Sequence, residues 1–147
     1  MINLTQSEAD ALLSLEKIVI DQKPYDFPGA GAFVNVPLVS RDRREEFLLD
    51  VRRGRIDVAK VTIQNRARVV VVLARLDLGS HPHTNPDLTV VGSPHLHVYR
   101  EGYAAKWATP VPSDVFTNTS DPWAALQDFM TFCNIVERPA FSNRLMP

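Results

Sequence analysis

The sequence has one cysteine, Cys133, among its 147 residues and therefore lacks any internal disulfide. Cys133 stands in the apolar run DFMTFCNIV without an adjacent cation, which predicts a buried, unreactive thiol rather than a nucleophile. A chain of this length buries a sufficient core without a disulfide or a metal. We expect a single domain over residues 1–147, in which residues 138–147 form a loosely held tail.

Long hydrophobic runs are also missing. The longest, Val69–Ala74, is too short to span a bilayer, which excludes a transmembrane helix. The N-terminal stretch MINLTQSEADALL carries acidic residues where a signal peptide needs positive charge. The sequence therefore predicts a cytoplasmic protein without a membrane partner.

The chain has no large excess of charge, since 16 Lys and Arg face 17 Asp and Glu, but its basic residues are gathered locally. Nine of them lie between Arg41 and Arg68, against five acidic residues in the same segment. This distribution fits a local anion-binding face, and it fits equally the solvated faces of ordinary strands.

Hydrophobic periodicity predicts a helix at each end of the chain. Thr5 and Glu8 form a capping box, and apolar residues continue at helical spacing to about Ile20. Ser120-Asp121-Pro122 is typical of a second helix start, and that helix is expected to end near Asn134.

Alternating apolar residues between these helices predict strands. We expect them at 45–53, 55–63, 68–78, 95–100 and 106–111, with a short edge strand at Phe33–Val36. Turns are expected at Arg53-Gly54 and Asn65–Ala67, and a bulge near Ala59-Lys60. The predicted fold class is α+β, an antiparallel sheet of four to five strands with an N-terminal and a C-terminal helix packed on one face.

All four histidines lie between His81 and His97, a concentration that packing does not require. In the strand that begins at His95, side chains two apart share a face, so His95, His97, Tyr99 and Glu101 are expected in one row. Arg75 and Asp77 share a face of the preceding strand by the same rule. A row of titratable groups indicates a functional pocket.

The loop before that strand carries His81 and His83 and is stiffened by Pro82, Pro86 and Pro94. Rigid loops beside strand ends often position reactive groups. We expect His83 to fold over the row and His81 only to shape the loop.

Four segments carry a resemblance to a known family. They are PHTNPD at Pro82–Asp87, PHLHVYREGY at Pro94–Tyr103, KWA at Lys106–Ala108 and TSD at Thr119–Asp121. The chain resembles a family of small, functionally uncharacterised bacterial proteins found near mobile elements. It departs from that pattern at Leu88, where the family has glycine, and His81 lies outside the pattern. In layout alone, the sequence is also similar to small toxins of toxin–antitoxin modules.

Histidine acid–base chemistry suggests a metal-independent ribonuclease with a toxin or defence role as one function. His95 or His97 would take the 2′-hydroxyl proton and His83 would protonate the leaving oxygen. The predicted catalytic residues are His83, His95, His97, Tyr99 and Glu101. The predicted phosphate-binding residues are Arg75, Arg100, Lys106, Arg53 and Arg55.

Two alternatives remain open from the sequence. A metal-binding hydrolase would use zinc or another divalent transition metal, held by His83, Asp87, His95 and His97, whereas the ribonuclease needs no cofactor. A non-enzymatic antitoxin or phage-related binding protein would present the same face to a protein partner or to RNA.

Overall fold

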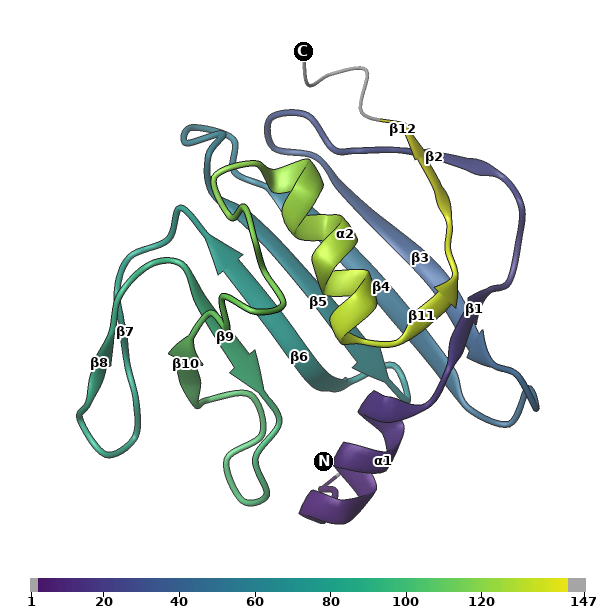
Figure 1. Cartoon of the computed structure of the whole chain (residues 1–147), viewed down its shortest axis with the longest axis horizontal. Helices are drawn as coiled ribbons and strands as arrows, with labels where there is room; N and C mark the ends of the chain where they lie inside the picture. The colour runs from purple at the N-terminus through teal and green to yellow at the C-terminus, as the bar shows by residue number, and fades with distance from the viewer. Residues whose placement is uncertain (1–2, 143–147) are drawn as a thin grey trace.

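A large mixed β-sheet is the main element of the fold. The computed structural model describes residues 3–142, and its main sheet has the strand order β10-β9-β6-β5-β4-β3-β1-β11 (Figure 1). The elements are α1 (Gln6–Ser14), β1 (Lys17–Val19), β2 (Pro24–Asp26), β3 (Phe33–Ser40), β4 (Glu46–Arg53), β5 (Val61–Ala67), β6 (Val71–Leu78), β7 (His83–Thr84), β8 (Val90–Val91), β9 (His95–Val98), β10 (Ala108–Pro110), α2 (Pro122–Phe132), β11 (Ile135–Glu137) and β12 (Ala140–Ser142). β7 pairs with β8, and β12 pairs with β2, in two small separate sheets.

The predicted sheet of four to five antiparallel strands with both helices on one face is wrong. The main sheet has eight strands, and β1 pairs in parallel with β11. α2 lies across the sheet, whereas α1 lies at one end of it (Figure 1). The first helix ends at Ser14 instead of about Ile20, because Lys17–Val19 pair with β3 and β11. Within residues 3–142, neither helix has the length and apolar character needed to cross a membrane.

Several strand boundaries also differ from the prediction. β3 is a long interior strand rather than a short edge strand. β5 begins only at Val61, so the predicted strand over 55–63 and its bulge near Ala59-Lys60 are wrong. The predicted turn at Asn65–Ala67 lies inside β5, and the chain reverses at Arg68 and Val69, whose φ angles are 51° and 69°. Such left-handed angles are uncommon for residues other than glycine, so the sequence carries no turn signal there.

Part of the segment predicted as a loose tail is a β-strand. Ala140–Ser142 of the predicted tail form β12 beside β2, and residues 143–147 lie outside the described part of the chain.

Cys133 is fully buried, and burial raises the pKa of its thiol to about 12. A thiol in that environment stays protonated at neutral pH.

One face of the sheet is apolar and the other is polar. In β5, buried residues alternate strictly with half-buried polar ones, as period-two geometry requires. In β6, Leu73 is an extra residue, because Asn65 pairs with Ala74 and Arg66 with Val72. This bulge shifts the alternation of β6, so that Ala74 joins Leu73 in the core and Arg75 turns to the polar face.

The side chain of a buried lysine caps the C-termini of both helices. Lys17 Nζ donates to the carbonyl oxygens of Leu13 (2.8 Å) and Leu15 (3.0 Å) at the end of α1, and to that of Cys133 (2.7 Å) at the end of α2. Burial lowers the pKa of Lys17 to about 8, which still leaves the ammonium form dominant at neutral pH. A cation is favourable at a helix C-terminus, and here one cation serves two helices.

We predict that Lys17→Met destabilises the fold by about 3 kcal/mol, because one buried and two part-buried carbonyl groups lose a charged donor. Urea denaturation followed by circular dichroism measures this change. Lys60→Met is the matched control, since the Lys60 side chain is exposed and makes no hydrogen bond within residues 3–142, and it should change stability by less than about 0.5 kcal/mol. Equal stability of the two variants would contradict the proposed capping role.

Candidate functional site

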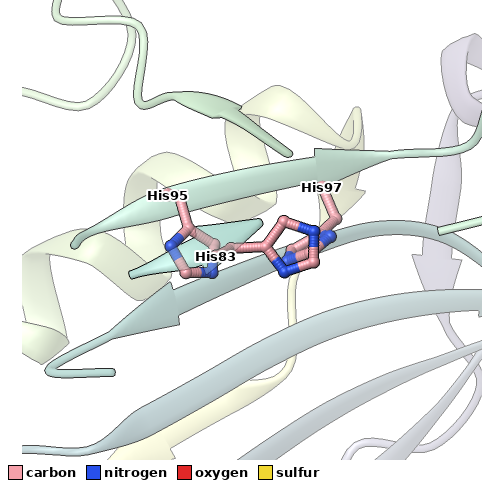
Figure 2. Close-up of side chains that lie close together, drawn as sticks. All are labelled: His83, His95 and His97. Carbon is pink, nitrogen blue, oxygen red and sulfur yellow. The ribbon is translucent and has the colours of Figure 1, made fainter. Parts of the chain in front are cut away.

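Three of the four histidines meet at the edge between the main sheet and the β7–β8 pair. His95 and His97 come from β9 and His83 from β7, and the three rings gather together (Figure 2). The ring centroid of His83 lies 5.6 Å from that of His95 and 4.7 Å from that of His97, and the last two are 5.0 Å apart. His95 and His97 are 2% and 0% exposed, and His83 is half-buried. The structure thus brings these three predicted site residues together.

Each imidazole is held by a main-chain carbonyl. His83 Nε2 lies 2.8 Å from the oxygen of Lys106, His97 Nδ1 lies 2.7 Å from that of Ala105, and His95 Nδ1 lies 3.2 Å from that of Gly92. A carbonyl oxygen only accepts, so the nitrogen that faces it carries the hydrogen. In the neutral rings, the lone pair is therefore on Nδ1 of His83 and on Nε2 of His95 and His97.

Asp77 and Arg75 of β6 adjoin the cluster. Asp77 Oδ2 lies 3.2 Å from Nε2 of both His95 and His97, and Arg75 Nε lies 3.2 Å from Asp77 Oδ1. Burial raises the pKa of Asp77, but its polar contact with His97 and the charge of Arg75, together with His97 and His95 whenever these rings are protonated, outweigh burial and lower the pKa below its ordinary value. Asp77 is accordingly a carboxylate at neutral pH.

Asn85 fixes the hairpin that carries His83. Its side-chain amide donates to the carbonyl oxygen of Ala108 (2.9 Å), and its side-chain oxygen accepts from the Ala108 amide (2.8 Å). This buried pair of bonds attaches the β7–β8 turn to β10. Leu88 in the same turn has a φ of 72°, a region that favours glycine, so the conformation there is strained for a leucine.

The cluster lies at one end of a polar surface that crosses five strands. One row of cross-strand partners consists of His95, Asp77, Thr62, Arg52 and Phe33. The adjacent row consists of His97, Arg75, Gln64, Asp50 and Asn35. A pocket of about 700 Å³, the central pocket, follows these rows from His83 and His95 to Phe33 and Arg52.

Three predicted site residues lie away from the histidines. The Tyr99 hydroxyl is buried and bonds to the backbone of Leu4, donating to its oxygen (3.1 Å) and accepting from its nitrogen (2.8 Å). Glu101 accepts from the Gln6 amide at the start of α1 (2.7 Å). Arg100 stacks on Trp107, with 4.2 Å between its Cζ and the ring centroid. β9 ends at Val98, which is why the expected row does not continue to Tyr99 and Glu101.

The remaining predicted residues are spread over the molecule. Asp87 accepts from the backbone and the hydroxyl of Thr89 and is not part of the histidine group. Lys106 lines a smaller pocket beside His83 and His97. Arg53 and Arg55 line another pocket, at the opposite end of the polar surface from the histidines.

Two residues of the site were missing from the predicted set. Asp77 was expected beside Arg75 but was not assigned a role, although the alternation of β6 and β9 also pairs it with His95. Asn85 lies in the proline-stiffened loop and was not assigned a role. Its buried side-chain bonds to β10 join segments separated in the sequence, and no local pattern signals them.

Comparison with known proteins gave one family match. The family of unknown function DUF6978 matches residues 4–135. No curated protein and no solved structure matches the chain. The expectation of an uncharacterised family is thereby confirmed, while its PHTNPD pattern and the toxin-like layout stay predictions. Because the match extends over most of the sequence, the chain belongs to the DUF6978 family.

Proposed function

We propose that the protein is a metal-dependent hydrolase whose ion is held by His83, His95 and His97. One observation carries this proposal: one nitrogen of each ring lies within 4.8 Å of the others, while each ring is also fixed by a backbone carbonyl. Histidines that bind metals in proteins commonly donate their second ring nitrogen to a carbonyl or carboxylate, which orients the ligand nitrogen.

The polar contacts of His97 Nε2 compete with each other. Arg75 Nη2 lies 3.1 Å from this nitrogen and can only donate, whereas Asp77 Oδ2 lies 3.2 Å from it and only accepts when ionised. A proton on Nε2 serves Asp77 but faces Arg75, and a lone pair on Nε2 serves Arg75 but faces Asp77. A divalent cation beside Asp77 would take the lone pairs of the imidazoles and offset the carboxylate charge, while Arg75 keeps its bond to Asp77.

The dimensions suit a transition metal after a small adjustment. Zinc–nitrogen bonds of about 2.1 Å place two tetrahedral ligands about 3.4 Å apart, so a modest inward rotation of the rings is needed. Imidazole ligands suit zinc and several other divalent transition metals. Three protein ligands leave a coordination position for water, as in catalytic zinc sites. His83, His95 and Asp77 all line the central pocket, which gives that position access to a substrate.

The surrounding residues suit hydrolysis of a phosphate ester. A bound divalent metal lowers the pKa of a water and polarises a phosphoryl oxygen. Asp77 stays ionised and is positioned to orient the attacking water by accepting its hydrogen bond. In the proposed step, the water oxygen would bond to phosphorus and lose a proton to solvent, while the bond to the leaving oxygen breaks and that oxygen takes up a proton from solvent. Arg75 lines the pocket and offers a guanidinium to the phosphate charge.

The metal-independent ribonuclease fits this geometry less well. An acid and a base must act on two different oxygens of a phosphodiester. The ring centroid of the predicted acid, His83, lies only 5.6 Å from that of His95 and 4.7 Å from that of His97, which leaves no space for a phosphate between the acid and either base. The alternative of a metal-binding hydrolase, without Asp87 as a ligand, therefore suits this geometry better.

We predict that the chelator-treated protein binds one Zn²⁺ or Co²⁺ per chain. His83→Ala should weaken binding more than about 100-fold, because it removes one of three ligands. Isothermal titration and elemental analysis measure this effect. His81→Ala is the matched control, since His81 is exposed and outside the cluster, and it should bind metal like the wild type. Unchanged binding by His83→Ala would contradict the assigned centre.

We predict that the metal-loaded protein cleaves single-stranded RNA and that chelation abolishes cleavage. Asp77→Asn, tested at saturating metal, should lower the cleavage rate about 100-fold while still binding the ion, because it removes the acceptor that orients water. A fluorogenic oligonucleotide assay gives both rates. Cleavage that survives chelation would support the metal-independent ribonuclease instead. A metal-saturated protein that leaves RNA and simple phosphodiesters intact would refute the hydrolase.

A further inference from the structure

A second pocket at the far end of the polar surface has a strongly positive lining. This distal pocket has a volume of about 300 Å³, and its charged lining residues are Arg52, Arg53, Arg55 and Lys60. Among the residues that the structure describes, no aspartate or glutamate lines it. Four cations around one small pocket indicate an anionic ligand.

The positive charge of the distal pocket is not neutralised within the described chain. On the same polar surface, Arg66 is paired with Asp50 and Arg75 with Asp77. Among the described residues, the Arg53 side chain donates only to the uncharged carbonyl oxygens of Val58 and Pro28. No salt bridge within residues 3–142 involves Arg52 or Lys60, and both residues are exposed. These two cations remain available to a ligand.

An exposed aromatic ring accompanies the free cations. Phe33 is 60% exposed, and the Cζ of Arg52 lies 5.4 Å from the centroid of its ring. Phenylalanine is usually buried, so an exposed ring beside a free guanidinium marks a surface that a flat partner can cover. Nucleic-acid bases stack on aromatic rings and arginine planes in this way.

The distal pocket is continuous with the histidine end. Phe33, Arg52 and Lys60 line both the distal and the central pocket. Arg52 pairs with Thr62, and Thr62 pairs with Asp77, so two strand spacings, about 10 Å, separate Arg52 from Asp77. An anion held by Arg52 is therefore not the one that reacts beside Asp77. A ligand that reaches both Arg52 and the histidine centre therefore needs more than one anionic group along its length.

We infer that single-stranded nucleic acid binds along this surface, across β6, β5, β4 and β3. One phosphate lies between Arg52 and Lys60, an adjacent base stacks on Phe33, and another phosphodiester reaches the histidine centre. The position of that second phosphodiester rests on the proposed function, whereas the distal contacts do not need a metal. A base paired in a duplex has no free face for Phe33, so the single strand is preferred.

The test measures binding of fluorescent oligonucleotides of about eight nucleotides to the chelator-treated full chain by anisotropy. Arg52→Gln should weaken binding of single-stranded RNA about tenfold and reduce the slope of log affinity against log salt by about one, because one phosphate contact is lost. Phe33→Leu should weaken binding about tenfold through loss of stacking, with little change in the salt slope.

Two control variants carry the same chemical changes elsewhere. Arg41→Gln removes a positive charge that is paired with Glu16 and Glu137, away from both pockets, and Tyr103→Leu removes an exposed ring beside Arg100. Both should bind like the wild type. Single-stranded DNA of the same sequence tests whether the ribose hydroxyl contributes, and tighter binding of either single strand than of the duplex supports the inference.

Three results would overturn the inferred binding surface. They are an Arg52→Gln variant that binds the oligonucleotide with wild-type affinity, control variants that lose as much affinity as Arg52→Gln and Phe33→Leu, and a duplex that binds as tightly as the single strands. Polyphosphate binding as tightly as RNA, with no effect of Phe33→Leu, would also refute the stacking contact. Binding is measured without metal, so it does not depend on the hydrolase. If the oligonucleotide binds as expected but the metal-loaded protein does not cleave it, only the proposed hydrolase is refuted. Metal-dependent cleavage of a small phosphodiester without oligonucleotide binding would refute only this inference.

Discussion

Three backbone carbonyl groups determine what the histidine cluster can do. The oxygens of Gly92, Ala105 and Lys106 each accept from one imidazole nitrogen and thereby fix which nitrogen keeps a lone pair. Free histidine rings exchange tautomers and rotate, whereas these rings are held by segments of the main chain. Any chemistry at this centre therefore uses nitrogens whose roles the backbone has already set.

The one-sided sheet gives the cluster its surroundings. The bulge at Leu73 keeps Leu73 and Ala74 in the core and turns Arg75 and Asp77 to the polar face, where β9 brings His95 and His97 beside them. Without that extra residue, period-two alternation would bury the guanidinium and the carboxylate under α2. An irregularity in one strand thus joins the histidines to the long polar surface.

Local patterns predicted part of the site and less of the fold. Alternation placed His95 and His97 on one face, and the capping box predicted the start of α1, where both reciprocal bonds are present. The short strands β1 and β11 were missed, because their pairing joins residues 17 and 135, and no local pattern encodes such a contact. Tyr99 was misplaced for a related reason, since its partner, Leu4, lies at the other end of the sequence.

The buried ammonium of Lys17 joins two segments that lie far apart in the sequence, the end of α1 and the end of α2. It needs the carbonyl oxygen of Cys133, and β1 needs β11 as its parallel neighbour. On the ribosome, α1 emerges well before residue 133, so the third acceptor of Lys17 and the parallel neighbour of β1 are absent until the chain beyond α2 has been synthesised. The last native contacts of the N-terminal segment therefore form only late in translation, and their large separation in sequence is typical of slow folding.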